Sequence, residues 1–232
     1  MEISWATMSF NYSAAILRGG LGPKFINSIV YSVIGTFLIV MLGLMIGFAL
    51  SKLGFKKMSL VIGGLIGFGY LISINSIIIP LFLTLKSMKL ADTHLGIILT
   101  YVAFGLPMAV MLSSQFIEGI PDSLIESAYI DGATTFRTFL SIIVPISTPV
   151  YITVGIINAL GIWNEFLLVM VLASSEFTKS LPVGVFSFTS LTGTQMGWQL
   201  AALVIAVLPV VIVYFAFNKR IAEGTITGAI KG

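Results

Sequence analysis

Five long stretches of apolar residues set the pattern of this chain, and none of them contains a Lys, Arg, Asp or Glu. They cover Phe25–Leu50, Met58–Leu85, Leu95–Ile117, Thr138–Asn164 and Ser180–Asn218. Each is at least as long as the roughly 20 residues that a helix needs to cross a hydrocarbon core of about 30 Å. Backbone groups in lipid must find their partners within the same segment, so we predict a helix for each stretch.

The composition is that of a membrane protein. Of the 232 residues, 57% are hydrophobic and 9% are charged, and the mean hydropathy is +1.08. A soluble domain usually carries about 25% charged residues. The net charge of +3 comes from scattered basic residues, which argues against a nucleic-acid-binding surface. We therefore predict an all-α integral membrane protein with about five transmembrane helices.

The distribution of basic residues predicts the orientation. If the cluster of lysines 52, 56 and 57 is cytoplasmic, the inside set is 52, 56, 57, 137, 219, 220 and 231, and the outside set is 18, 24, 86, 89 and 179. An excess of Lys and Arg is typical of cytoplasmic loops. We therefore expect an external segment 1–24, a transmembrane domain 25–218 with a cytoplasmic loop 118–137, and a cytoplasmic tail 219–232.

The loop 118–137 is a polar island between two apolar stretches. Pro121 and Asp122 suit the first turn of a helix, where a missing N–H matters little and an acid is favourable. Gly132 supplies a backbone conformation that residues with a Cβ resist. The pattern predicts a short helix, Asp122–Ile130, which is either an amphipathic connector at the membrane interface or a docking helix for a soluble partner. Its apolar side would hold Leu124, Ile125 and Ala128 at three- and four-residue spacing.

The spacing in this loop resembles the Glu-Ala-Ala loop of bacterial ABC importer permeases, the inner-membrane components of binding-protein-dependent transport. In that family Glu-Ala-Ala is followed by three residues, a glycine, nine residues and Ile-x-Leu-Pro. The matching offsets hold Glu126, Ser127, Ala128, Gly132, Ile142 and Pro145. Two positions depart from the pattern, Ser127 for alanine and Val144 for leucine, and both changes are small.

Further motifs extend the resemblance to the maltose-permease-like carbohydrate-uptake group. They are Ile120-Pro121-Asp122, Ile130-Asp131-Gly132-Ala133, Trp163-Asn164-Glu165-Phe166, Leu181-Pro182-Val183-Gly184, Glu223-Gly224 and Gly228-Ala229-Ile230-Lys231-Gly232. The resemblance covers the chain from about Phe25 to its last residue, whereas the family usually has one more N-terminal helix. Proline and glycine in the segment Ser174–Gln195 predict a broken or re-entrant path there.

The resemblance implies a permease subunit of an ATP-driven ABC importer for a sugar or oligosaccharide, located in the bacterial plasma (inner) membrane. Asp122–Ile130 would be the coupling helix that seats in a cleft of an ATPase subunit, with Glu126 making a polar contact and Gly132 allowing the turn. The tail Gly224–Gly232 resembles one that reaches towards the ATPase dimer interface. The coupling residues implied are Asp122, Glu126, Ser127, Ala128, Asp131 and Gly132.

Energy would come from other polypeptides. The chain contains no Gly-x-x-x-x-Gly-Lys-Ser/Thr stretch, the loop that binds nucleotide phosphates, so we predict that it is not an enzyme and that ATP and Mg²⁺ bind to a partner. The resemblance implies two copies of an ATPase subunit, a second and different permease subunit, and an extracytoplasmic solute-binding protein. It does not identify the sugar.

Four residues are candidates for the translocation path: Asn75, Trp163, Asn164 and Glu165. A carboxylate within a membrane segment is costly and indicates a function by default. The alternative for Glu165 is an interfacial residue at the outer end of its span, with Trp163 as an aromatic anchor. Asn75, in the middle of the second stretch, either lines the path or makes a structural hydrogen bond between helices.

Two other classes of protein fit this sequence less well. An ion-coupled secondary transporter or channel would need a charged relay at mid-membrane, and only Glu165 comes close. An intramembrane enzyme would need paired catalytic groups, and the chain has no cysteine and a single histidine. His94 follows Asp92 and Thr93, so we expect it to start a helix, and we predict no metal site. Close helix packing is expected at Gly63, Gly64, Gly67 and Gly69.

Overall fold

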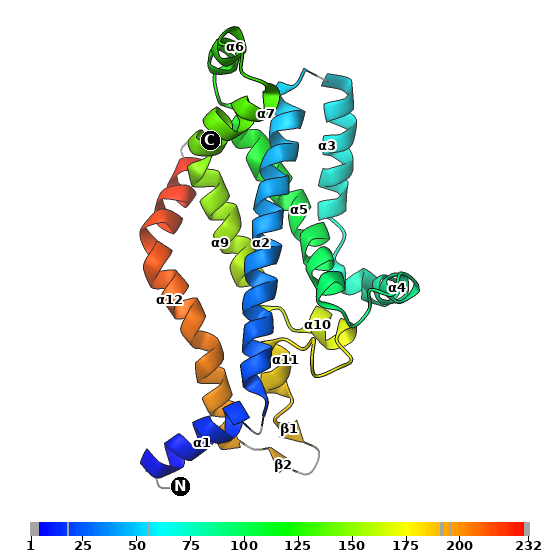
Figure 1. Ribbon diagram of the computed structural model, residues 1–232, viewed down its shortest axis with the longest axis vertical. Coiled ribbons are helices and arrows are strands. Elements are labelled where there is room, and N and C mark those ends of the chain that lie inside the picture. The colour runs from blue at the N-terminus through cyan, green and yellow to red at the C-terminus, as the bar shows by residue number, and fades with distance from the viewer. Residues whose placement is uncertain (1–4, 18, 55, 191–192, 195, 230–232) are drawn as a thin grey trace. The chain divides into compact units, whose positions relative to one another are not determined.

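The computed structural model describes residues 5–17, 19–54, 56–190, 193–194 and 196–229, and they are almost entirely helical (Figure 1). The helices are α1 (Trp5–Leu17), α2 (Leu21–Lys52), α3 (Lys56–Tyr70), α4 (Ile74–Ser87), α5 (His94–Glu118), α6 (Asp122–Ile130), α7 (Thr135–Thr138), the π-helical turn η1 (Phe139–Ile143), α8 (Val144–Ile146), α9 (Thr148–Asn164), α10 (Leu167–Leu172), α11 (Leu181–Phe186) and α12 (Met196–Ala229). Two short strands, β1 (Thr189–Ser190) and β2 (Gly193–Thr194), pair antiparallel. The predicted all-α class is confirmed.

Five apolar segments appear, as predicted, but three of them are not single helices. The fifth stretch, Ser180–Asn218, holds α11 and the two strands before α12 begins at Met196, and the second and fourth are bent. Among the described residues, α2, α5 and the part Met196–Ala216 of α12 are long and apolar enough to cross a membrane. Two bent pairs of helices bring the number to five if each pair forms one span. The hydropathy pattern therefore located the apolar segments, but it did not reveal the bends within them.

The second apolar stretch is broken after Tyr70. Ser59–Tyr70 and Ile74–Ser87 meet at a bend of 102°, so the prediction of one continuous helix was wrong. Turn hydrogen bonds replace helical ones at the break, from the amide of Leu71 to Phe68 O and from that of Ile72 to Gly69 O. The glycines of α3 lower its helix preference, while the residues at the break stay apolar.

The fourth stretch is broken at Ser147, where Thr135–Ile146 and Thr148–Asn164 meet at 77°. Pro145 and Pro149 flank this residue. Neither has an N–H to donate to the preceding turn, and Ser147 between them leaves the helical conformation, with φ −79° and ψ 9°. The straight helix after Pro145 that the sequence suggests therefore begins only at Thr148, and Glu165 lies just beyond its end.

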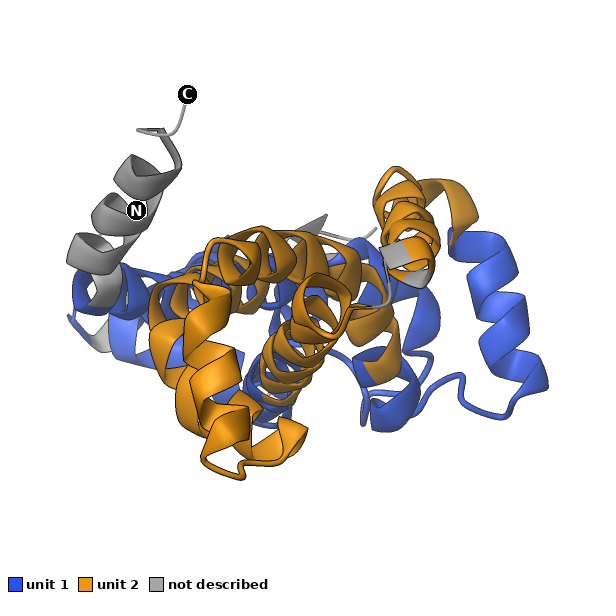
Figure 2. Ribbon diagram, turned by 90° about the horizontal axis from the view of Figure 1, so that it is seen from above, with its two compact units in different colours: residues 1–33, 78–98, 160–218 blue, residues 34–77, 99–159, 219–232 orange. Residues whose placement is uncertain are grey.

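The chain divides into two compact units, coloured separately in Figure 2. Unit 1 comprises residues 1–33, 78–98 and 160–218, and unit 2 comprises 34–77, 99–159 and 219–232. A core in unit 1 holds Ala15, Leu21, Trp163, Leu181, Val185, Phe188, Ala201 and Ala202. A core in unit 2 holds Leu44, Phe48, Ile117, Ile120, Ile125, Phe139 and Ile143.

Close helix packing occurs in unit 2, but not at the glycines predicted for it. A Cβ added to Gly47 would lie 2.9 Å from both Ser113 Cβ and Ser114 N, and one added to Gly43 would lie 2.7 Å from Ala109 Cβ. Small residues four apart on both α2 and α5 thus let the two backbones approach. By contrast, a Cβ at Gly63, Gly64 or Gly67 would meet nothing within 4 Å, and one at Gly69 would only touch Pro107, at 4.0 Å.

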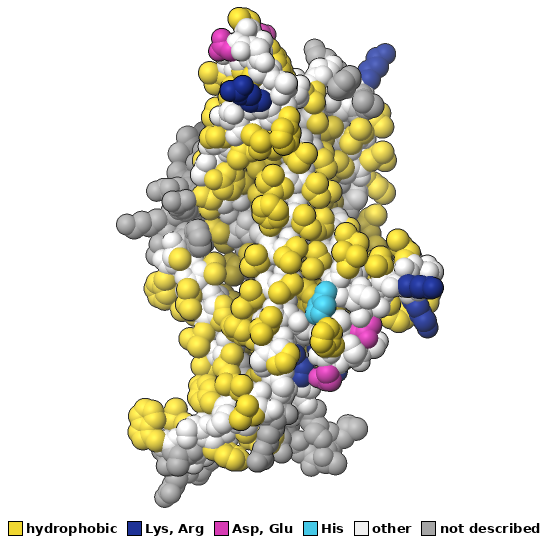
Figure 3. Space-filling model, in the orientation of Figure 1, with side chains coloured by type: hydrophobic (Ala, Val, Ile, Leu, Met, Phe, Trp, Pro, Cys, Tyr) yellow, Lys and Arg dark blue, Asp and Glu magenta, His cyan; other side chains and the backbone are white. Residues whose placement is uncertain are grey.

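Apolar side chains lie on the surface as well as in the cores. Figure 3 shows hydrophobic side chains over much of the face in view, and exposed examples on α2 and α12 are Phe37 (61%), Val33 (61%) and Ile212 (65%). Such side chains suit a hydrocarbon environment, in which they need no cover from the protein itself. In unit 2, acidic side chains appear in the same view over α6 (Figure 3).

Candidate functional site

The helix α6 forms over the residues predicted, Asp122–Ile130, and local sequence explains both of its ends. Pro121 precedes the helix in an extended conformation, with φ −57° and ψ 133°. At this position its backbone would donate no helical hydrogen bond, so the missing N–H of proline costs nothing. Asp122 then places a carboxylate in the first turn. At the other end Gly132 has φ +79°. Its amide bonds Tyr129 O at 3.0 Å, and the next amide, of Ala133, bonds Ala128 O at 2.9 Å. This pair of bonds is the Schellman motif, which favours glycine at that position.

One side of α6 is buried, and it is narrower than the sequence suggested. Ile125 (5% exposed) lies in the core of unit 2, and Ala128 (8%) is buried on the same helix. Leu124 was expected to share this side, but it is 42% exposed. Consecutive helical residues point about 100° apart, and the core of unit 2 covers only the direction of Ile125.

The rest of α6 is open, and it is apolar as well as charged. Tyr129 is 42% exposed and Ile130 is 85% exposed, and Phe136, shortly after the helix, is 62% exposed. Of the coupling residues implied by the resemblance, five are exposed: Asp122, Glu126, Ser127, Asp131 and Gly132. The sixth, Ala128, is buried, so its side chain holds α6 to unit 2 and does not lie on the open surface.

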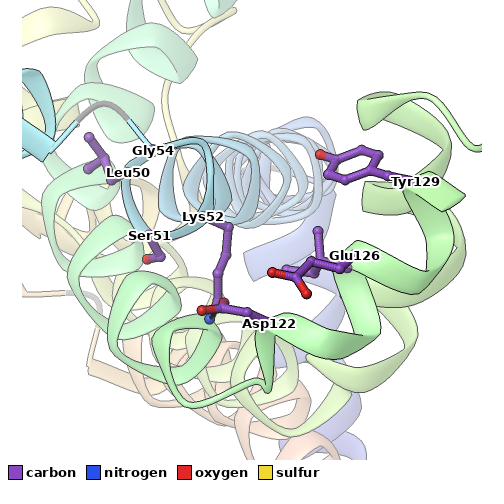
Figure 4. Close-up of a pocket in the computed structure, with 8 residues that line it drawn as sticks. Leu50, Ser51, Lys52, Gly54, Asp122, Glu126 and Tyr129 are labelled. Atoms are coloured by element: carbon purple, nitrogen blue, oxygen red, sulfur yellow. Dashed lines mark hydrogen bonds and ion pairs between the residues drawn. The ribbon is translucent and has the colours of Figure 1, made fainter.

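A buried lysine holds the start of α6, and sequence reasoning missed it. Lys52, the last residue of α2, donates to Ile120 O at 2.7 Å and to Glu118 O at 3.2 Å, and pairs with Asp122 Oδ1 at 2.7 Å. Figure 4 shows its side chain running from the end of α2 towards Asp122. The sequence presented Lys52 only as part of a basic cluster. The sequence did contain one signal for this contact. Lys52 ends one predicted helix and Asp122 begins another, and these are the helix ends at which a cation and an acid are favourable.

A pocket of about 330 Å³ lies beside this contact. Glu126 and Tyr129 line it from α6 (Figure 4), and the end of α2 forms the other wall. The charged groups of the lining are Lys52, Asp122 and Glu126, and Lys52 pairs with Asp122. The residues lining it are Leu50, Ser51, Lys52, Gly54, Asp122, Ile125, Glu126 and Tyr129.

Two of the four candidate path residues line a second pocket, which belongs to unit 1 and has a volume of about 410 Å³. Trp163 is 7% exposed, and its indole N–H donates to Ala206 O at 3.0 Å. Asn164 is exposed and donates to Leu160 O at 2.8 Å. The whole lining is Trp163, Asn164, Phe166, Pro182, Val185, Phe186, Gln199, Leu203, Ala206, Val207 and Val210.

The other two candidates do not line this pocket. The Glu165 carboxylate accepts from the amides of Leu168 (2.7 Å) and Val169 (3.3 Å), so it caps the N-terminus of α10. Asn75 is exposed in the first turn of α4, directly after the bend, rather than in the middle of a straight helix.

Unit 1 also holds a polar network that the sequence did not reveal. We call residues Ser174–Leu181 the clasped segment. Asp92 Oδ1 accepts from the amides of Ser174 and Ser175, both at 3.1 Å, and from the hydroxyls of Ser175 and Thr178. Burial raises the pKa of Asp92, but these hydrogen bonds outweigh it and hold the pKa below its ordinary value. Asp92 has φ +57°, a conformation that aspartate tolerates.

Side chains of α2 hold the same segment from another direction. Asn27 donates to Phe177 O and Lys179 O at 2.8 and 2.9 Å, and Ser28 Oγ accepts from the amide of Leu181 at 2.8 Å. Tyr31 donates to Thr178 O at 2.7 Å, so its oxygen accepts from His94 Nδ1, 2.9 Å away. His94 begins α5, as predicted.

Comparison with known proteins identifies the family. The model of the family described as "Binding-protein-dependent transport system inner membrane component" matches residues 12–226. A putative ABC transporter permease, ORF2 of Caldicellulosiruptor sp., is 35% identical over 96% of this chain and 80% of its own length. The diacetylchitobiose uptake system permease NgcG of Streptomyces coelicolor is 33% identical over 95% of this chain and 74% of its own.

A solved structure supports the fold. A chain of a bacterial ABC transporter involved in the import of the acidic polysaccharide alginate superposes with a TM-score of 0.78, covering 90% of this chain and 78% of that chain. The two sequences are 24% identical, so this likeness bears on the fold alone.

Proposed function

This chain belongs to the family of binding-protein-dependent transport system inner membrane components, and from that premise we propose how it works within its transporter. As a member, it is a multi-pass permease subunit of an ABC importer in the inner membrane, and it works with ATPase and solute-binding partners. This membership favours the importer over an ion-coupled secondary transporter or channel.

The proposed coupling element is α6, placed on the cytoplasmic side of the membrane. The observation that carries this proposal is a short helix, closed at its C-terminal end by a Schellman motif, with an open surface of Leu124, Tyr129 and Ile130 beside Glu126. An amphipathic connector at the membrane interface would also expose apolar residues. The acidic groups among them, Glu126, Asp122 and Asp131, suit a polar protein cleft better than lipid. Docking on an ATPase subunit therefore explains the whole surface.

ATP hydrolysis takes place, in this proposal, in partner subunits. The sequence lacks a nucleotide-binding loop, so ATP and Mg²⁺ would bind to two copies of an ATPase subunit. A second, different permease subunit completes the membrane part, and a binding protein delivers the substrate. Closure of the ATPases would move α6 and so switch the permease between its two accessible states.

The proposed substrate is a sugar or oligosaccharide. The relative named for diacetylchitobiose uptake, which is 33% identical to this chain, points to this class. The pocket of unit 1 has suitable chemistry, since aromatic faces pack on sugar rings and amides bond hydroxyls. Asn164 Oδ1 accepts no hydrogen bond from the described residues, and Trp163 and Gln199 lie in the same lining. Glu165 and Asn75 have a less direct place in the proposed path, because Glu165 caps α10 and Asn75 lies outside this pocket.

The coupling role is tested in the assembled transporter with Glu126→Lys and Gly132→Pro. Both variants should reach the membrane and both should lose the stimulation of ATP hydrolysis by the loaded binding protein. Lys57→Glu, a charge reversal of the same size at an exposed residue, serves as the control and should keep the stimulation. If both α6 variants retain full stimulation, α6 is not the coupling element.

A further inference from the structure

We propose that Lys52 is a positioning residue that passes movement of α6 on to α2; this inference rests on the coupling function proposed above. Its side chain is only 7% exposed. The ammonium group meets three oxygens: Ile120 O and Asp122 Oδ1, both at 2.7 Å, and Glu118 O at 3.2 Å. A lysine has three N–H donors, so the three contacts use its whole capacity.

The position of Lys52 joins the ends of three helices. The last carbonyl groups of α5 lack partners within their helix and carry partial negative charge. The lysine donates to the carbonyl of Glu118, the last residue of α5, and to that of Ile120 in the turn that follows. Asp122 places its carboxylate at the opposite kind of end, the N-terminus of α6. Lys52 itself closes α2, where a cation is favourable. One ammonium group therefore lies at the ends of all three helices. We call Lys52 and its contacts with Glu118, Ile120 and Asp122 the Lys52 junction.

The junction extends a stiff pair of helices. Gly43 and Gly47 bring α2 against Ala109 and Ser113 of α5, with no room for an added methyl group. Closer to the junction, Ser51 Oγ donates to Ser114 O at 3.0 Å. Interlocked helices do not deform continuously. A displacement of α6 that pulls on Asp122 and on the turn before it is therefore carried to the end of α2.

A simpler role for Lys52 would be that of a juxtamembrane charge that sets orientation. That role requires an ammonium group in water or at lipid headgroups, and Lys57 meets this requirement because it is exposed. Lys52 does not, because its side chain is only 7% exposed and its ammonium group already meets three protein oxygens. The burial and the three acceptors distinguish Lys52 from its neighbour in the basic cluster.

The test uses the complete transporter, with both permeases, the ATPases and the binding protein, reconstituted in lipid. Four variants are compared: Lys52→Met, Lys52→Arg, Asp122→Asn and the control Lys57→Met. The first readout is the number of substrate molecules transported per ATP hydrolysed. The second is amide hydrogen exchange over residues 119–124, which reports opening of the junction and does not depend on whether α6 couples to an ATPase.

Lys52→Met should lower the transport ratio by about tenfold, the size expected for losing charge-assisted hydrogen bonds, and should speed exchange over 119–124. Asp122→Asn should have a smaller effect in both readouts, because two carbonyl contacts remain. Lys52→Arg should restore most of the wild-type behaviour, since a guanidinium keeps the charge and the donors. Lys57→Met should match the wild type.

Two results would overturn the proposal. Unchanged exchange in Lys52→Met means that the junction does not position α6. Faster exchange with an unchanged transport ratio means that the Lys52 junction positions α6 but does not transmit its movement. The coupling role of α6 is then decided by the Glu126→Lys and Gly132→Pro variants alone. If those two variants also retain full stimulation, it is the coupling function that has failed, while the exchange result still decides the junction.

Discussion

The α6 loop and the clasped segment are both short connections between longer helices, yet they are held in place in different ways. Nearly all hydrogen bonds of α6 lie within residues 121–133, and its long-range polar contact is the Lys52 junction. The clasped segment has little regular structure of its own before α11. It is held by residues far away in the sequence, such as Asn27, Tyr31 and Asp92.

This difference suits different tasks. A helix that is complete in itself can shift as a unit without losing its own hydrogen bonds, as a docking element must. A segment whose backbone is bonded to several other elements stays fixed unless all of those bonds break. Under the proposed coupling function, α6 would be the element of unit 2 that moves, while the clasped segment would stay fixed within unit 1.

Removal of the Asp92 carboxylate, which holds the clasped segment, should have the largest effect on stability. Asp92→Ala deletes the acceptor of four hydrogen bonds from Ser174, Ser175 and Thr178. We expect the free energy of unfolding to fall by about 3 kcal/mol, because charged acceptors are costly to lose and amides are left unpaired. Asp122→Ala, whose carboxylate is 74% exposed, should lose less than about 1 kcal/mol. Denaturant unfolding in detergent measures both, and equal losses would remove the contrast.

The packing of α2 on α5 should rank second. Gly47→Ala places a methyl group 2.9 Å from Ser113 Cβ and Ser114 N, which forces the helices apart. We expect a loss of about 1–3 kcal/mol. Gly64→Ala is the matched control, because its methyl group meets nothing within 4 Å and alanine favours a helix. The control should be neutral or slightly stabilising in the same unfolding measurement, and a loss there as large as at Gly47 would contradict this account.

The end of α6 should respond more weakly and only locally. Gly132→Ala requires a residue with a Cβ to adopt φ +79°, which costs about 1 kcal/mol. Amide exchange at Gly132 and Ala133 should become faster, since these two amides form the Schellman bonds. Exchange in the clasped segment should not change. Equal acceleration in both regions would show that α6 is not an independent element.

Protonation of Glu176, which lies in the clasped segment, should have the smallest effect on stability. Hydrogen bonds from Lys179 and Lys24 lower the pKa of Glu176 from its ordinary 4.5 to about 2. A folded-state pKa below the unfolded one means that the stabilisation is complete above about 4.5 and is lost as the pH falls towards about 2. The side chain is 67% exposed, so solvent screens the effect.

The measurement is the thermal midpoint of wild type and Glu176→Gln as the pH is lowered. The two should differ slightly at neutral pH and converge between about pH 4.5 and pH 2. A gap that stays constant over this range would show that the ionised carboxylate does not stabilise the fold.

Local and composition-based features of this protein could be predicted from the sequence. Hydropathy located five apolar segments because burial in lipid is a property of each residue by itself. The bounds of α6 and the turn at Gly132 were predictable because caps and a positive φ depend on residues only a few positions apart. The spacing from Glu126 to Pro145 led to the family for the same reason.

Only the tertiary structure decided which residues meet over long distances. Lys52 was one lysine of a cluster until folding buried it against Glu118, Ile120 and Asp122. Glu165 was a candidate for the path, and the fold uses its carboxylate to cap α10. The glycines between positions 63 and 69 and the pair Gly43 and Gly47 look equally suited to close helix packing in the sequence. Only Gly43 and Gly47 pack closely in the structure, because they lie against α5. Composition records how apolar a helix is, whereas the contact made by each of its faces depends on the neighbours that the fold brings to it.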